Sequence, residues 1–312
     1  MADHRLMWLV GIVLGLLTIA SLTSAVLRRR ITRAETQKTL ANLSARIKAW
    51  WVMVAVFVLA LLVGRLGAVA LFGLVSFWAL REFLTLAPTR RGDHRSLFWV
   101  FFVITPLQYV LVAMQWYGLF VILIPVYAFL FIPLRNAIAG DCEHFLERTA
   151  KIQWALMVCV YCVSHAPALL GLPIRGFEGR GGELLFFFVM VVQISDVLQY
   201  VWGKTFGRTK IAPVVSPNKT WEGFVGGVAS ATVIGMLLWW VTPFRPWQAG
   251  VMALICTLMG FAGGLTMSAI KRDRGVKDFG TLIEGHGGVL DRIDSICFAA
   301  PVFFHLTRYW FT

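Results

Sequence analysis

A dense group of charged residues near the end of the chain is the part best suited to chemistry. The segment 268–294 contains five cationic side chains and five carboxylates, and long apolar stretches flank it on both sides. Cations such as Lys271 and Lys277 bind phosphate oxygens, whereas carboxylates such as Asp291 and Asp294 bind hard divalent cations. Charges so close to apolar stretches are costly, so the segment predicts a functional site for a phosphate and a metal ion.

A second polar stretch precedes the first along the chain. Residues 216–223, with the sequence SPNKTWEG, form a polar turn suited to hydrogen bonds with a nucleotide or a phosphate. Upstream, Gln193, Asp196 and Gln199 recur at intervals of three within an apolar run, which predicts that they share one inward-facing side of a helix. A carboxylate at such a depth predicts a metal ion or a lysine beside Asp196.

The two stretches together resemble the signature of the phosphatidate cytidylyltransferases, also called CDP-diacylglycerol synthases. In the first stretch the matching positions are Ser268, Lys271, Arg272, Lys277, Asp278, Gly280, His286, Gly287, Gly288, Asp291, Arg292 and Asp294. In the second they are Ser195, Asp196, Gly203, Lys204, Phe206, Gly207, the run 216–223, Gly226 and Gly227. The matches cover most of residues 195–295, about a third of the chain.

Two positions depart from the pattern of the family. Relatives usually have a Gly-Asp pair four residues ahead of the signature serine, whereas this chain has Gly263 and Gly264. Relatives usually have Pro-Gly before His-Gly-Gly, and here the pair is Glu284 and Gly285. Because the missing aspartate is expected to bind metal in the family, either Glu284 or Asp196 replaces it, or the protein is a divergent paralogue.

The resemblance implies a reaction and a set of site residues. A phosphate oxygen of phosphatidate would attack the α-phosphorus of CTP and expel pyrophosphate, with Mg²⁺ as cofactor and a second metal ion left open. The side chains expected to act on the reacting phosphates are Lys271, Arg272, Lys277, Asp278 and His286. Those expected to bind substrate are Ser216, Asn218, Lys219, Ser268 and Arg292. The expected metal ligands are Asp291, Asp294 and Asp196.

Several of these residues could instead have purely structural roles. Asp291 would simply cap the last helix, and Asp294 would pair with a nearby cation. Asp278 would either bind a second metal or orient Lys277. Residues 135–151 contain a further acidic group, but Glu147 and Lys151 lie four apart, which favours a solvated helical turn.

Composition predicts an all-α polytopic membrane protein of nine or ten spans. Of the 312 residues, 58% are hydrophobic and 14% are charged, against about a quarter charged in soluble proteins. About 20 apolar residues cross a bilayer core. The expected segments are 6–27, 50–64, 66–84, 97–115, 117–134, 152–172, 183–203, 224–243, 248–270 and 289–311. Residues 28–49 between the first two are expected to form an amphipathic helix at the inner leaflet.

The Lys and Arg residues are distributed very unequally between the two sides. With ten spans and the N-terminus outside, 22 of the 29 lie on the inner side, six lie outside and Arg292 lies in the last span. Because inner loops are enriched in these residues, both polar stretches are expected to face the cytoplasm of a bacterial inner membrane. The net charge of +13 therefore indicates anionic lipid and the bilayer rather than nucleic acid.

The chain divides near residue 183, where polar residues within the spans become frequent. We expect residues 1–182 to form a scaffold and lipid platform, and residues 183–312 to carry catalysis. A homodimer is left open. The rival functions are a CTP-dependent enzyme on another lipid phosphate or lipid alcohol, and a weakly active paralogue that binds lipid or nucleotide. A transporter is disfavoured because the charged group is one-sided and the two halves are unlike.

Overall fold

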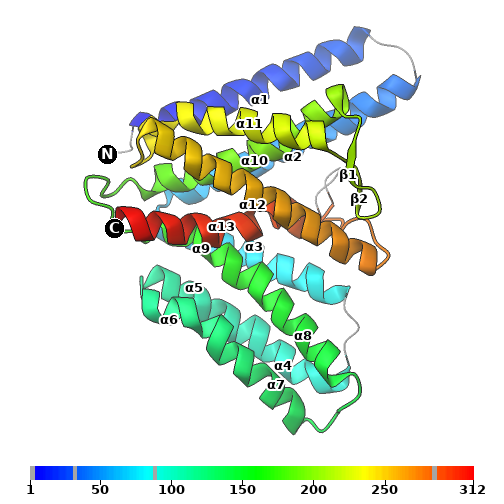
Figure 1. The fold of residues 1–312 in the computed structure, drawn as a ribbon, viewed down its shortest axis with the longest axis vertical. Coiled ribbons are helices and arrows are strands. Elements are labelled where there is room, and N and C mark those ends of the chain that lie inside the picture. The colour runs from blue at the N-terminus through cyan, green and yellow to red at the C-terminus, as the bar shows by residue number, and fades with distance from the viewer. Residues whose placement is uncertain (1–3, 31–33, 87–89, 283–286) are drawn as a thin grey trace.

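The protein is a bundle of long helices that lie side by side (Figure 1). A computed structural model describes residues 4–30, 34–86, 90–282 and 287–312. The first half contains α1 (His4–Arg30), α2 (Ala34–Leu62), α3 (Arg65–Thr85), α4 (His94–Trp99), α5 (Thr105–Ala113), α6 (Tyr117–Ile122), α7 (Phe129–Ile138), α8 (Phe145–Leu156) and α9 (Val163–Ala168). The second contains α10 (Gly181–Phe206), β1 (Lys210–Ala212), β2 (Ser216–Thr220), α11 (Trp221–Leu237), α12 (Pro246–Asp273) and α13 (Leu290–Phe311). The prediction of an all-α polytopic fold is confirmed.

Three of the membrane-length helices are each built from two α-helical pieces joined by a π-helical turn. These turns are Val100–Ile104 between α4 and α5, Leu123–Ala128 between α6 and α7, and Met157–Cys162 between α8 and α9. Proline lacks the N–H that continues an α-helix, and Pro106 and Pro125 lie just after the first turn and inside the second. The chain therefore crosses the bundle at these places without a loop.

Eight helices of the described residues are long and apolar enough to cross a membrane. The prediction was nine or ten. The difference comes from two helices at the C-terminal end of the chain: α11 is apolar but only 17 residues long, and α13 begins with the charged signature residues. Both nevertheless pack within the bundle, α11 against α10 and α12, and α13 against α12 and α9.

The prediction of a separate interfacial helix over residues 28–49 was wrong. The first helix continues to Arg30, and α2 runs without interruption from Ala34 into its span. Polar residues near the start of α2 are compatible with helix, so they form one continuous helix with the apolar residues that follow. The turn that follows, between α2 and α3, depends on Gly64, whose φ of 88° is one that side-chain-bearing residues rarely adopt.

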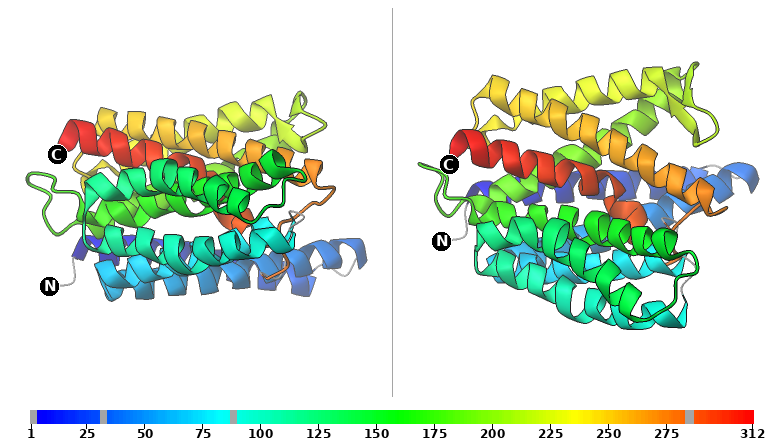
Figure 2. Two further views of the ribbon diagram at one scale, coloured as in Figure 1. Left: turned by 90° about the horizontal axis from the view of Figure 1, so that it is seen from below. Right: turned by 60° about the horizontal axis from the view of Figure 1, so that its bottom comes forward.

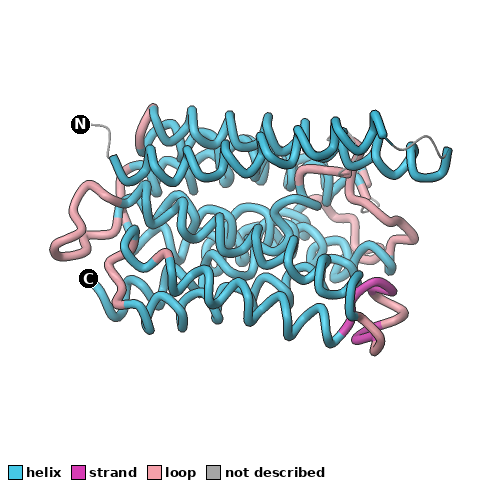
Figure 3. Tube along the Cα trace, turned by 90° about the horizontal axis from the view of Figure 1, so that it is seen from above, coloured by secondary structure: helices cyan, strands magenta, loops and turns pink. Residues whose placement is uncertain are grey.

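The two ends of the bundle carry different features. The chain termini lie together at one end, and the hairpin of β1 and β2 projects from the opposite end (Figures 2 and 3). The loop between α12 and α13 lies at the same end as the hairpin (Figure 1). Large buried rings such as Phe188 and Phe303, whose centroids are 5.1 Å apart, join α10 to α13 in the core. Both signature stretches therefore meet at one end of the molecule.

Candidate active site

The hairpin between α10 and α11 carries the first set of site residues. Its strands pair antiparallel, with Lys210 opposite Thr220 and Ala212 opposite Ser216. The Thr220 hydroxyl then accepts a hydrogen bond from Gly223 N at 3.2 Å and so caps the start of α11. The carboxylate of Glu222 accepts further bonds from the backbone N–H groups of residues 208 and 209. These contacts fix the hairpin with Lys219 directed into the bundle.

A cavity of about 280 Å³ lies where the hairpin meets α10, α12 and α13. Five of the predicted charged residues line it, together with Asn218 and Ser268 from the predicted substrate-binding set. The lining residues are Asp196, Gln199, Tyr200, Asn218, Lys219, Thr220, Gly223, Phe224, Phe261, Gly264, Ser268, Asp291, Arg292, Asp294 and Ser295. Every one of them lies between residues 196 and 295, although the division of the chain at residue 183 stays a prediction.

Two carboxylates from different helices meet at one hydroxyl in this cavity. Ser295 Oγ donates a hydrogen bond to Asp196 Oδ2 at 2.7 Å and lies 3.4 Å from Asp294 Oδ1. The backbone N–H of Ser295 donates to the same Asp294 oxygen at 2.8 Å. Among the described residues, Asp196 Oδ1 and Asp294 Oδ2 have no hydrogen-bond donor. Two carboxylates held this close repel each other unless a cation lies between them.

Two protein cations face the carboxylates. Lys219 Nζ lies 4.4 Å from the centroid of the Phe261 ring, and the charges of Asp196 and Asp294 act on it. Burial lowers the pKa of the Lys219 ammonium, and the two carboxylates oppose that shift only in part. The Nε atom of Arg292 is buried, and the described residues give it no hydrogen-bond acceptor.

Asp291 is engaged by the protein itself. Its Oδ1 forms an ion pair with Lys271 Nζ at 2.8 Å, and both side chains are buried. Its Oδ2 accepts hydrogen bonds from the backbone N–H groups of Phe279 at 2.8 Å and Gly288 at 2.9 Å. This arrangement ties Asp291 to the loop before α13 rather than to the first N–H groups of the helix, and it uses the ammonium of Lys271. Metal binding by Asp291 and phosphate binding by Lys271 stay predictions.

The remaining predicted residues that the structure describes do not line the cavity. Arg272 binds the backbone carbonyl oxygens of Val215 and Val276, each at 3.2 Å, and so joins the hairpin tip to the next loop. Ser216 pairs within the hairpin, and Lys277 and Asp278 are exposed in the loop. His286 and Glu284 lie outside the described residues.

Gly264 occupies the wall of the cavity on α12. A Cβ atom at this position would lie 3.2 Å from Lys219 Nζ and 3.9 Å from Asp294 Oδ2. The place where the resemblance predicts an aspartate is therefore beside both the lysine and the proposed metal ligand. The glycine itself supplies no carboxylate at that place.

The donor set fits a magnesium ion that is held largely by substrate. Within the described ranges, no three His, Cys, Asp or Glu side chains converge. Asp196 and Asp294 nevertheless each present one oxygen atom that has no donor among the described residues, and both residues line the cavity. Magnesium is commonly bound by one or two carboxylates, with substrate phosphates and waters completing its octahedron.

Sequence reasoning missed several residues of the cavity. Ser295 is the clearest case, because it follows the signature and only the contact between α10 and α13 reveals its bond to Asp196. The aromatic side chains of Tyr200, Phe224 and Phe261 were missed because aromatic residues are common in membrane helices. The adjacency of Phe224 to the SPNKTWEG run was the one available signal.

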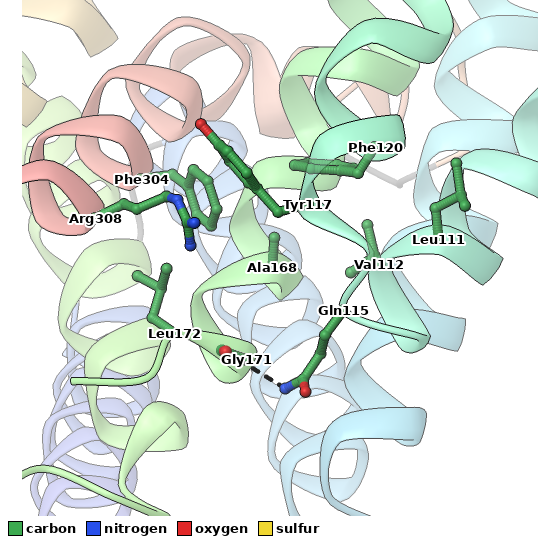
Figure 4. Close-up of a pocket in the computed structure, with 10 residues that line it drawn as sticks. All are labelled: Leu111, Val112, Gln115, Tyr117, Phe120, Ala168, Gly171, Leu172, Phe304 and Arg308. Atoms are coloured by element: carbon green, nitrogen blue, oxygen red, sulfur yellow. Dashed lines mark hydrogen bonds between the residues drawn. The ribbon is translucent and has the colours of Figure 1, made fainter. Parts of the chain in front are cut away.

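A second, smaller cavity lies near the opposite end of the bundle (Figure 4). Its volume is about 40 Å³, enough for a water molecule or two. Arg308 lies over the Tyr117 ring at 3.7 Å from its centroid, and Gln115 donates to the carbonyl oxygen of Gly171 at 3.4 Å. The described side chains that line it include no carboxylate, so it is not a candidate for phosphate and metal chemistry.

The fold and the cavity define a class of protein: a polytopic membrane protein with carboxylates and cations gathered at one end of its bundle. Within this class the chain belongs to the Cytidylyltransferase family, whose model matches residues 44–310. The family assignment from the two signature stretches is confirmed. The enzyme class that this family defines is transfer of a cytidylyl group.

Two kinds of relative resemble the chain. "Uncharacterized protein YnbB" of Escherichia coli (strain K12) is 40% identical over 272 residues, which is 86% of this chain and 88% of that protein. "Phosphatidate cytidylyltransferase" of Staphylococcus aureus (strain COL) is 34% identical over 158 residues, 49% of this chain and 60% of that protein. The enzyme of the same name from Staphylococcus saprophyticus is 37% identical over 127 residues, 40% of this chain and 49% of that protein. The match thus covers only about half of the length of the relatives that carry this enzyme name.

Proposed function

We propose that the protein transfers the cytidylyl group of CTP to phosphatidate, forming CDP-diacylglycerol and pyrophosphate, with the site facing the cytoplasm. The observation that carries the proposal is the cavity in which Asp196 and Asp294 face Lys219 and Arg292. Paired carboxylates that face two cations suit a polyphosphate that arrives with a divalent metal. The named Staphylococcus relatives support phosphatidate as the acceptor.

The reaction requires alignment of the two substrates and neutralisation of phosphate charge, and it requires no general base. A phosphate oxygen of the lipid forms a bond to the α-phosphorus of CTP, and the bond from that phosphorus to the β-phosphate oxygen breaks. The lipid oxygen is already ionised at neutral pH, so no protein group has to remove a proton. Magnesium, when bound, would neutralise charge on the phosphates and orient them for in-line displacement.

The residues of the chain divide this work between them. Asp196 and Asp294 would hold the metal ion, and the hydroxyl of Ser295 fixes the orientation of Asp196. Lys219 and Arg292 would bind the anionic oxygens of the nucleotide as charge moves onto the leaving pyrophosphate. The aromatic side chains of Tyr200 and Phe224 offer flat surfaces for the cytosine ring. Basic residues around the mouth of the site would attract the anionic lipid.

A panel of acceptor lipids tests the substrate. Purified protein in micelles would receive CTP labelled at the α-phosphate, Mg²⁺, and either phosphatidate, lysophosphatidate, a polyprenyl phosphate or diacylglycerol. We expect label in a product that co-migrates with CDP-diacylglycerol, only with phosphatidate and only with Mg²⁺. Labelled product from another lipid phosphate, with none from phosphatidate, would replace the proposed substrate. Label in no lipid at all would favour the weakly active paralogue.

The γ-phosphate distinguishes one further alternative. An enzyme that uses CTP as a phosphate donor to a lipid alcohol would transfer label from the γ-position to diacylglycerol or a polyprenol. We expect no lipid product from γ-labelled CTP. Appearance of such a product would make the protein a lipid kinase instead of a nucleotidyltransferase.

A further inference from the structure

The start of α13 is held by a carboxylate from the other half of the chain. Glu82, near the end of α3, is buried. Its Oε1 accepts a hydrogen bond from Val289 N at 2.9 Å, and its Oε2 accepts one from Leu290 N at 2.8 Å. The first N–H groups of a helix have no partner within the helix. A residue that lies more than 200 positions earlier thus supplies the N-terminal partners of the helix that carries the signature aspartates.

The glycines of the signature loop fit around this carboxylate. A Cβ atom on Gly288 would lie 2.4 Å from Glu82 Oε2, and one on Gly280 would lie 2.7 Å from Oε1. Both distances are too short for any side chain. Because glycine has no side chain, the loop can close on Glu82 at these two positions. The two glycines therefore make room for a protein side chain rather than for a ligand.

The neighbouring residue of α3 contacts the other end of the same loop. The ring of Phe83 stacks on that of Phe279 with centroids 6.1 Å apart. Lys271 Nζ lies 5.3 Å from the Phe279 centroid and donates a hydrogen bond to Asp291 Oδ1. Two successive residues of α3 therefore contact the segment between α12 and α13, Phe83 at Phe279 and Glu82 at the end of the segment.

We propose that Glu82 is a positioning residue that sets the orientation of α13 and thereby directs Arg292 and Asp294 into the cavity. Both of its oxygens are used by backbone N–H groups, and it is not among the residues that line the cavity. It therefore acts through α13 rather than on substrate or metal. A negative charge at a helix N-terminus also stabilises the helix, because that end of the helix dipole is positive. A neutral side chain does not give this stabilisation.

The first test observes the backbone directly and needs no activity. Amide hydrogen exchange in micelles, without nucleotide or metal, would be followed in peptides that contain Val289 and Leu290. We expect exchange of these amides in Glu82→Gln to be at least about tenfold faster than in wild type, since a neutral amide is a weaker acceptor than a carboxylate. Glu183→Gln is the matched control, because Glu183 is also buried but pairs with Arg180 at the other end of the bundle. Unchanged exchange at 289 and 290 in Glu82→Gln would overturn the proposal.

The second test separates positioning from general loss of stability, and it rests on the proposed function. For the folded fraction, we expect Glu82→Gln to lower kcat at least about tenfold and to raise the Mg²⁺ concentration for half-maximal rate, while the KM for phosphatidate changes less than about threefold. A merely structural role would lower the melting temperature and leave these values per folded molecule as in wild type, which would contradict the proposal. If wild type transfers no cytidylyl group, the exchange result still decides the role of Glu82.

A paired substitution keeps the proposal falsifiable if Glu82→Gln does not fold. Gly288→Ala places its methyl group against the carboxylate, and Glu82→Asp withdraws that carboxylate by one carbon. We expect the double variant to be more stable and to exchange more slowly at Leu290 than Gly288→Ala alone. Strict additivity of the two substitutions would show that the two positions do not interact, and would overturn the account.

Discussion

The Nζ atom of Lys219 lies 3.2 Å from the point where a Cβ atom on Gly264 would stand. That point is also 3.9 Å from Asp294 Oδ2, so the wall of α12 approaches both a cation and a proposed metal ligand. Of these neighbours, a Cβ atom at position 264 would crowd only the flexible end of the lysine. The absence of a carboxylate here leaves the positive charge of Lys219 less compensated than an aspartate would.

Gly264→Asp tests what that absence does. We expect the variant to fold and to reach half-maximal rate at a lower Mg²⁺ concentration, because a third carboxylate would join Asp196 and Asp294. Gly264→Ala supplies the Cβ without the charge and should match wild type within about twofold in its Mg²⁺ requirement. A higher or unchanged Mg²⁺ requirement in Gly264→Asp would mean that position 264 does not contribute to metal binding.

Glu284→Gln tests the other departure from the family pattern. If Glu284 replaces the missing aspartate, this variant loses activity and needs more Mg²⁺, and adding Gly264→Asp partly restores the rate. Titration of Mg²⁺ for the two single variants and the double variant provides the measurement. Behaviour of Glu284→Gln like wild type at every Mg²⁺ concentration would end the compensation hypothesis.

The lowered pKa of Lys219 predicts a pH dependence. Burial favours the neutral amine, so the positive charge is lost at a lower pH than for an ordinary lysine. We expect kcat/KM for CTP, which reports the free enzyme, to fall with rising pH below the usual lysine range. Lys219→Arg keeps its charge at every accessible pH and should abolish that alkaline decline, whatever its absolute rate. An identical decline in Lys219→Arg would assign it to another group.

Labelling of single cysteines tests the orientation in the membrane. Cys142 is exposed and would first be replaced by serine to remove background. We expect Arg90→Cys and Lys210→Cys to react with a membrane-impermeant maleimide only after the cells are opened, and Glu178→Cys to react in intact cells. Labelling of positions 90 and 210 in intact cells would reverse the proposed orientation.

The sequence was sufficient for the architecture because apolar runs and the placement of Lys and Arg are local properties. They predicted both termini at one end of the bundle and the signature loops at the other, and the structure agrees (Figure 1). The boundary between α1 and α2 was not predictable from apolarity, because a helix continues past the membrane wherever its polar residues are compatible with helix. The short hairpin before α11 was missed for the opposite reason: it has too few residues for a periodic pattern.

The charged side chains that line the cavity were predictable from the sequence, but their pairings were not. Asp196, Lys219 and Asp294 were recognised from residue types and from family resemblance, and they do share one cavity. That Asp291 would pair with Lys271, or that Ser295 would bind Asp196, depends on how α10, α12 and α13 cross. Spacing along one helix fixes which residues share a face, but the partner of that face is set by tertiary packing.

The rate of Asp294→Ala tests the central claim most directly. In micelles with α-labelled CTP, phosphatidate and Mg²⁺, we expect this variant to keep the wild-type melting behaviour and to lose well over 90% of the rate. A loss of one metal ligand removes charge neutralisation in the transition state, and tenfold in rate corresponds to about 1.4 kcal/mol. A folded Asp294→Ala protein that retains more than about a tenth of the wild-type rate would contradict the account, because the metal and the reaction would then have to lie elsewhere.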